Sequence, residues 1–222
     1  MMTELVLHYA PDNASLSVRL ALEMQGRPYR TRLVDRRAQA QRGAEYLTLN
    51  PMGLIPVLET PSGPLFETAA ILLWLSETGA PLFPPPGAAA RGPALTWLFW
   101  LSNTMHTGLR ARFYPGQFPF ASPEETEARM TALLDMAEAH LAPLMAAEAP
   151  GLLDCYLAPQ LRWLQLYPGP GWPPLSGWPN LEALAARMEA LPATARVAEA
   201  EGLGPRPFTA PQPCRPKEGA AL

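Results

Sequence analysis

A proline-rich stretch, APLFPPPGAAARGP at residues 80–93, divides the chain into two parts with different patterns. Proline fixes its own φ and lacks an N–H, so such a run continues neither a helix nor a strand. Before it, apolar runs alternate with helical patterns; after it, we identify helical patterns alone. We therefore expect the following division: an α/β domain over 1–80, a linker over 81–90, an all-helical domain over 91–204 and a proline-rich, extended or disordered tail over 205–222.

The sequence before the proline-rich stretch predicts the element order β-α-β-α-β-β-α. Apolar or alternating runs predict strands at 3–9, 28–34, 55–60 and 63–68. PSG joins the last two as a hairpin. Helical spacing predicts helices at 14–26, 44–50 and 68–79, and two of these end at a glycine.

The second part predicts five helices. They are expected at 91–113, 122–149, 151–167, 179–191 and 193–200. The helix at 122 opens with SPEE, which supplies a serine N-cap, a proline at the first helical position and a glutamate at the third.

Composition narrows the possible functions. The net charge of −3 gives no general reason to bind nucleic acid or an anionic membrane. No apolar run is long enough to predict a membrane span. The two cysteines, Cys155 and Cys214, lie far apart, and no signal peptide is evident, so we expect no disulfide framework and a cytoplasmic location. The histidines and carboxylates show no metal-ligand spacing, so we expect no metal.

One cluster of arginines interrupts this weakly acidic sequence. It is explained either as a solvated loop or as a loop that faces an anion, and its members are Arg27, Arg30, Arg32, Arg36, Arg37 and Arg42.

The element order, with NPMGLIPVLET at 50–60 and FETAAILLWL at 66–75, resembles the glutathione S-transferase family over roughly residues 4–204. The resemblance implies a thioredoxin-like first domain, a helical second domain, glutathione as co-substrate and a homodimer with its sites near the subunit boundary. It also implies a role in detoxification.

The resemblance places glutathione on four residues of the first domain. The Ile55–Pro56 bond is expected to be cis, with the Ile55 backbone paired to the cysteinyl unit; otherwise the proline merely ends a turn. Thr68 at a helix N-terminus suits the γ-glutamyl carboxylate, and Glu67 the adjacent ammonium. The alternative makes Thr68 a cap and Glu67 a surface residue.

The sequence offers more than one candidate residue to stabilise the glutathione thiolate. The turn YAPDNASLS is most similar to the bacterial beta class, whose cysteine is replaced here by Ala14. Ser15 matches the serine donor of theta-like and zeta-like relatives, and is our first candidate. Tyr9 matches the tyrosine of mammalian-type classes; Ser17 is a weaker candidate. Because PDNA stands where thioredoxins carry CxxC, an intrinsic dithiol oxidoreductase is excluded.

His106 is the third candidate catalytic residue. Helical geometry places Phe99, Ser102, Asn103, His106 and Arg110 on one stripe of the 91–113 helix. Beta-class relatives carry a histidine there that enters the cleft, although His106 is also compatible with a structural role. Asn103 is expected to bind glutathione. The electrophile is expected near Phe99, Arg110, Phe113 and Tyr114.

These features predict a glutathione transferase that conjugates glutathione to a small apolar electrophile. Two alternatives remain open. One is a non-catalytic module that binds glutathione or a partner, suggested by the missing cysteine. The other is a glutathione-dependent isomerase or reductase.

Overall fold

The computed structural model describes residues 4–117, 122–146, 149–166 and 175–221. Four strands form one mixed sheet in the order β2-β1-β3-β4. β1 (Leu5–Tyr9) pairs parallel with β2 (Tyr29–Leu33) and antiparallel with β3 (Val57–Thr60), which pairs antiparallel with β4 (Gly63–Phe66). This sheet is the thioredoxin-like arrangement that we expected.

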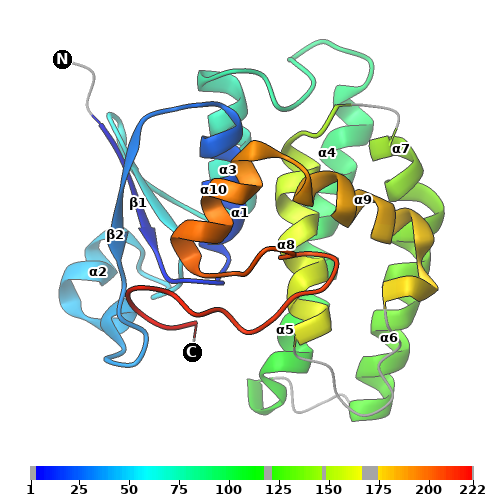
Figure 1. The fold of residues 1–222 in the computed structure, drawn as a ribbon. Coiled ribbons are helices and arrows are strands. Elements are labelled where there is room, and N and C mark those ends of the chain that lie inside the picture. The colour runs from blue at the N-terminus through cyan, green and yellow to red at the C-terminus, as the bar shows by residue number, and fades with distance from the viewer. Residues whose placement is uncertain (1–3, 118–121, 147–148, 167–174, 222) are drawn as a thin grey trace.

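Helices cover both faces of the sheet, and its two central strands, β1 and β3, are largely buried (Figure 1). α1 (Ser15–Met24) and α3 (Thr68–Thr78) pack on one face, where Leu7 and Leu58 join the main core. α2 (Ala44–Leu49) covers the other face, and its Tyr46 packs with Val34 and Val57. α1 ends before Gly26, whose φ of 59° favours glycine.

The second part is helical. α4 (Arg91–Trp100), a π-helical turn (Leu101–Met105) and α5 (His106–Phe113) form one continuous rod, as do α6 (Pro123–Met136), a second π-helical turn (Ala137–Leu141) and α7 (Ala142–Ala146). The other helices are α8 (Leu152–Leu166), α9 (Pro179–Glu189) and α10 (Pro192–Glu201).

The expected helices are all present, and residues 147, 148 and 167 of two of them lie outside the described residues. Ser122 and Glu125 form the capping box that SPEE predicts. Short 3-10 helices, not predicted, lie at Ala40–Arg42, Pro115–Gln117 and Leu175–Gly177. No helix in the described part of the chain is long and apolar enough to cross a membrane.

Gly151 immediately precedes the central helix α8, whose first residue is Leu152. Gly151 donates its N–H to Asp154 Oδ2 at 2.9 Å. A Cβ at Gly151 would lie 2.7 Å from the Leu82 carbonyl oxygen, which accepts the Leu152 N–H at 2.8 Å. The contact with the 81–90 segment thus leaves no room for a side chain at this position.

The described part of the tail is extended and packs against the rest of the chain. Phe208 is fully buried in the main core, and Arg162 donates to the carbonyl oxygens of Pro207 and Gln212. Arg215 donates its N–H to the Gly202 carbonyl at 2.7 Å. The tail then runs from the helical part back to the sheet, and the described chain ends near the β1–α1 turn (Figure 1).

Candidate functional site

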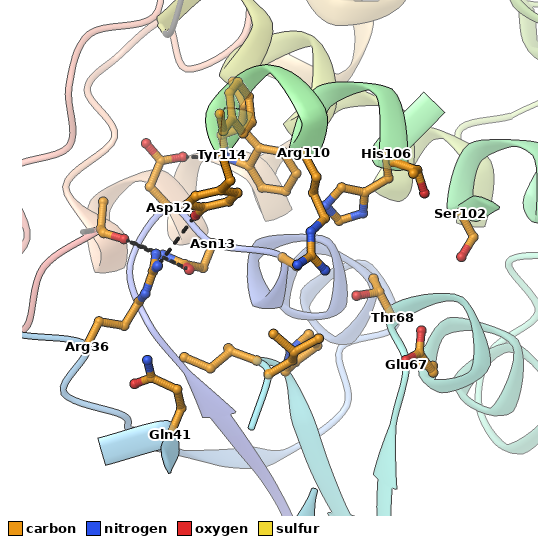
Figure 2. Close-up of a pocket in the computed structure, with 18 of the residues that line it drawn as sticks. Asp12, Asn13, Arg36, Gln41, Glu67, Thr68, Ser102, His106, Arg110 and Tyr114 are labelled. Atoms are coloured by element: carbon orange, nitrogen blue, oxygen red, sulfur yellow. Dashed lines mark hydrogen bonds between the residues drawn. The ribbon is translucent and has the colours of Figure 1, made fainter. Parts of the chain in front are cut away.

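A cavity of about 820 Å³ lies where the β1–α1 turn, the segment before β3 and the start of α3 face α5 and α8. Elements from both parts of the chain contribute to it, so its shape depends on how they pack. Figure 2 shows the polar side chains that project into it from opposite sides.

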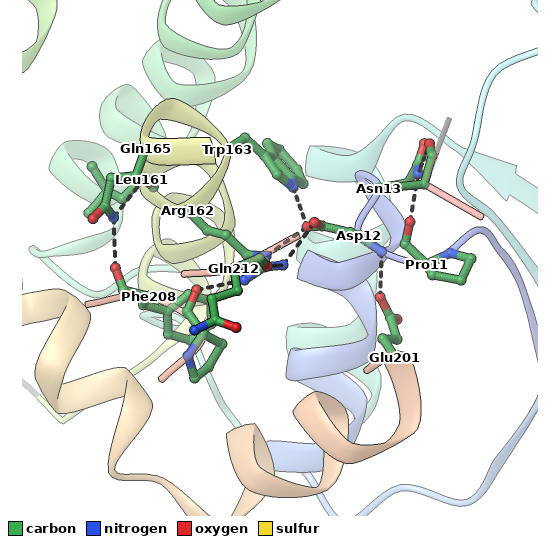
Figure 3. Close-up of polar contacts among 12 residues, drawn as sticks. Pro11, Asp12, Asn13, Leu161, Arg162, Trp163, Gln165, Glu201, Phe208 and Gln212 are labelled. Carbon is green, nitrogen blue, oxygen red and sulfur yellow. Dashed lines mark hydrogen bonds and ion pairs between the residues drawn. The ribbon is translucent and has the colours of Figure 1, made fainter. Parts of the chain in front are cut away.

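Asp12 anchors the β1–α1 turn to α8 through a buried ion pair (Figure 3). Its carboxylate accepts from Arg162 Nε and Nη2 at 2.8 and 2.9 Å, and from Trp163 Nε1 at 2.9 Å. Asp12 adopts a φ of 54°, uncommon for a residue with a side chain. The turn is therefore held by residues 150 positions away in the sequence.

Glu201 holds the same turn from α10. It accepts the Asp12 N–H at 2.8 Å and pairs with Arg19 at 3.3 Å. Burial raises the pKa of the Glu201 carboxyl to about 7, although Arg19 and the Asp12 N–H oppose this shift. Two buried carboxylates and two arginines thus fix the entrance to α1.

Asn13 follows Asp12 and lines the cavity together with Arg36 (Figure 2). Arg36 Nη1 donates to Asn13 Oδ1 at 2.9 Å and to the Ala221 carbonyl oxygen at 2.5 Å. Asn13 Nδ2 also donates to Ala221, at 3.0 Å. The tail thereby becomes part of the cavity wall, which the sequence did not predict.

Ser15 and Tyr9 do not line the cavity. Ser15 is fully buried, and its hydroxyl donates to the Ala10 carbonyl oxygen at 3.1 Å. The Tyr9 hydroxyl donates to Glu218 of the tail at 2.5 Å, and both burial and Glu218 raise the Tyr9 pKa. The structure thus corrects the expected placement of these two residues, since the Asp12 turn presents Asn13 and Ala14 to the cavity instead.

The four expected glutathione anchors do lie together. Ile55, Pro56, Glu67 and Thr68 all line the cavity, and the Ile55–Pro56 bond is cis, as the resemblance implies. Thr68 is the first residue of α3 and is 7% exposed, so its hydroxyl and the free N–H groups of the helix N-terminus are near one another. Glu67 has a φ of 71° and is exposed beside it.

His106 faces these anchors from α5. Its Nδ1 lies 3.2 Å from the Tyr156 hydroxyl oxygen, and its ring lies 5.7 Å from that of Trp163. Burial, and secondarily the charge of Arg110, lowers the pKa of His106 to about 4. The imidazole is therefore neutral near pH 7.

The prediction that Phe99 lies on the same face of the helix as His106 is wrong. Ser102, Asn103 and Arg110 line the cavity with His106, and Phe113 and Tyr114 follow. Phe99 does not line the cavity and is 53% exposed. The π-helical turn at Leu101–Met105 is wider than an α-turn, so it rotates Phe99 away from the stripe.

Several lining residues were not predicted from the sequence: Asp12, Asn13, Tyr156, Trp163 and Ala221. Arg36 and Arg42 belong to the arginine cluster, and both line the cavity, as the anion-facing alternative requires. Arg30 and Arg32 instead pair with Glu4 and Glu45. Among the described residues, no group of three histidine, cysteine or acidic side chains is placed to hold a metal.

Family comparisons match both parts of the chain. The model for the glutathione S-transferase N-terminal domain matches residues 14–78, and that for the C-terminal domain matches residues 124–187. Together these matches span more than half of the chain.

Individual proteins agree with the family models. The glutathione S-transferase GstA of Escherichia coli O157:H7 is 26% identical over 207 residues, 89% of this chain and 98% of that protein. A maleylacetoacetate isomerase of Rhizobium meliloti is 43% identical over 79 residues, which are 35% of this chain and 37% of the isomerase.

A solved structure of a glutathione transferase homologue from Sulfitobacter, with bound glutathione, superimposes with a TM-score of 0.76. It is 26% identical, and the match covers 88% of this chain and 97% of that one. The fold, the cis Ile55–Pro56 segment and both domain matches agree, and the chain belongs to the glutathione S-transferase family.

Proposed function

We propose that the protein binds glutathione in this cavity and catalyses attack of its thiolate on a small electrophile with an apolar body. One observation carries the proposal: the anchors Ile55, Glu67 and Thr68 share the cavity with Ala14, the N-cap residue of α1, and with His106. The aromatic side chains of Phe113, Tyr114 and Trp163 supply the apolar wall for the electrophile.

The γ-glutamyl end of glutathione would bind at the start of α3. The first N–H groups of this helix lack intrahelical partners, and together with the Thr68 hydroxyl they suit a carboxylate. The exposed Glu67 carboxylate would accept from the ammonium, and the Ile55 backbone would pair with the cysteinyl unit. Asn103, across the cavity, would add a polar contact.

The sulfur would then lie between the start of α1 and His106. Lowering a thiol pKa by two units requires about 2.7 kcal/mol of preferential thiolate stabilisation. A helix N-terminus and one or two hydrogen bonds supply this amount. With Ser15 and Tyr9 facing elsewhere, we assign the stabilisation to the α1 N-terminus beside Ala14 and to His106.

The Tyr156 hydroxyl is compatible with the tautomer of His106 that this role needs. Its oxygen lies 3.2 Å from His106 Nδ1, and the Tyr156 O–H can donate to that nitrogen. In that arrangement the imidazole proton sits on Nε2, and Nε2–H can donate to the thiolate.

A His106→Asn variant tests this assignment. We expect kcat to fall about 10-fold or more while the KM for glutathione changes less than about 3-fold, because one charge-assisted hydrogen bond to sulfur is lost. The thiolate limb of the pH–rate profile should move to higher pH. His106 itself should not titrate between about pH 5 and 8, because its pKa is about 4.

The matched control is His140→Asn, since His140 is exposed on the α6–α7 rod outside the cavity. Initial rates of conjugation with an aryl halide, measured across pH for both variants, provide the comparison. Equal rates and pH profiles for the wild type and His106→Asn would remove His106 from the mechanism.

Glutathione-dependent isomerisation is the second candidate, because one relative is named maleylacetoacetate isomerase. It would use the same thiolate, which adds to a carbon–carbon double bond and leaves after rotation. Product analysis with an unsaturated diketo acid separates the two reactions.

We also propose that the protein is a homodimer and that it is located in the cytoplasm. Met52 (62% exposed), Phe66 (37%) and Phe99 (53%) are large apolar side chains left open to solvent, which supports a homodimer. Light scattering should then give twice the chain mass of 24.2 kDa. Cys155 and Cys214 are free thiols, as a reducing cytoplasm allows.

A further inference from the structure

Arg110 projects a positive charge into the cavity from α5. It lies one helical turn after His106, and Figure 2 shows its side chain descending between Tyr114 and His106 toward Thr68. Its hydrogen bond to the neutral Gln117 amide oxygen is long, at 3.4 Å. Within the part of the chain that the structure describes, no carboxylate lies within ion-pair distance of Arg110.

Among the described residues that line the cavity, arginines outnumber carboxylates. Four lining residues are arginines: Arg36, Arg42, Arg110 and Arg112. The two lining carboxylates are Asp12 and Glu67, and the first is neutralised by Arg162. This surplus of arginines in the described lining contrasts with the net charge of −3 of the whole chain.

Glutathione does not account for Arg110. In the proposed binding mode, its γ-glutamyl carboxylate lies at the start of α3. Its second carboxylate, at the other end of the tripeptide, has Arg36 and Arg42 nearby in the first domain. Arg110 comes from the helical part, on the side assigned to the electrophile, together with Phe113 and Tyr114.

A second explanation of the positive charge of Arg110 is the helix dipole, because a cation near the C-terminal end of a helix stabilises that helix. Arg110 does lie in the last turn of α5. If Arg110 serves only to stabilise the helix, its guanidinium need not turn into the cavity. The protein would then show no preference for anionic over neutral electrophiles. The two explanations therefore differ in a measurable way.

We propose that the electrophile carries a carboxylate and that Arg110 binds it, so that this residue selects anionic acceptors. The inference rests on the proposed function, because it assigns a substrate class to the same cavity. A planar guanidinium presents parallel N–H donors that match a carboxylate, and such pairs are strong where water is partly excluded. The neighbouring aromatic side chains would hold the apolar body of the acceptor.

The test uses two acceptors that differ only in charge, 4-chloro-3,5-dinitrobenzoate and the corresponding benzamide. In both reactions the thiolate forms a C–S bond to the ring carbon, chloride leaves with the bonding electrons, and the thiol proton passes to the buffer. Each kcat/KM is divided by the uncatalysed rate constant with glutathione at the same pH, which removes the difference in intrinsic reactivity.

We expect the normalised kcat/KM of the benzoate to exceed that of the benzamide about 10-fold or more. Arg110→Gln should abolish the preference, which is the ratio of the two normalised kcat/KM values; any effect of the lost charge on the thiolate is common to both acceptors and cancels in this ratio. Arg129→Gln is the matched control, because it removes the same charge from an exposed position on α6 outside the cavity. Equal values for the two acceptors, or a preference retained in Arg110→Gln, would overturn the proposal.

A binding measurement separates this proposal from the proposed function. Unreactive 3,5-dinitrobenzoate and its amide are titrated in the presence of glutathione, and binding is followed by quenching of tryptophan fluorescence. Preferential benzoate binding that is lost in Arg110→Gln supports the anion site even if no conjugation occurs, in which case the proposed function alone fails. Equal binding of both compounds contradicts the anion site.

Discussion

Replacing Asp12 with alanine is expected to lower the free energy of unfolding by about 3–5 kcal/mol, the largest effect of any single substitution proposed for this protein. The side chains of Asp12 and Arg162 are 1% and 0% exposed, so the variant leaves a guanidinium buried without its counter-charge. Trp163 also loses its hydrogen-bond acceptor. Urea unfolding followed by tryptophan fluorescence and circular dichroism measures the change.

The control is Glu4→Gln, which breaks the exposed Arg30–Glu4 pair. Solvent screens that pair, so its loss should cost less than about 1 kcal/mol. Asp12→Asn keeps the size of the side chain, so its loss of unfolding free energy should lie between those of Asp12→Ala and Glu4→Gln. A loss in Asp12→Ala no larger than that in Glu4→Gln would show that the buried pair does not hold the β1–α1 turn.

Replacing Thr68 with valine is expected to raise the dissociation constant for glutathione about 10- to 100-fold. Valine keeps the shape of threonine but removes the hydroxyl, and a hydrogen bond to a charged group contributes about 1.5–3 kcal/mol. Thr68 is the first residue of α3, so the variant should retain the helix. Calorimetric titration gives the affinity, and an unfolding curve reports separately on stability.

Thr68→Ser provides the rescue, because it keeps the donor and removes only a methyl group. It should bind glutathione within about 3-fold of the wild type. If valine binds as tightly as threonine, or if serine fails as severely as valine, the carboxylate does not bind at the start of α3.

Local sequence signals predicted most of the fold. Gly26 marks the end of α1, SPEE marks the start of α6, and the hairpin around PSG joins β3 to β4. Each of these signals acts through bonds between near neighbours, so it can be recognised in a single sequence. The anchor residues of the first domain follow from the resemblance for the same reason, since they lie in two short motifs.

The remaining features depend on contacts distant in sequence. Ser15 was expected in the cavity, but the Asp12 turn, fixed by Arg162 and Glu201, presents Asn13 instead. The tail carries no periodic pattern, and its path depends on the burial of Phe208 and on the Arg36–Ala221 contact. No pattern of residue spacing in a single sequence predicts contacts between residues so far apart. The π-helical turn that displaces Phe99 is likewise not encoded in a recognisable pattern.

The proposed function requires the cavity to bind glutathione and to ionise its thiol without a cysteine or a serine donor. The most direct measurement is a calorimetric titration of glutathione near neutral pH in two buffers of different ionisation enthalpy. We expect binding with release of a substantial fraction of one proton, so the observed enthalpy should differ between the buffers. Binding with the same enthalpy in both would contradict thiol ionisation, and an absence of binding would contradict the site itself.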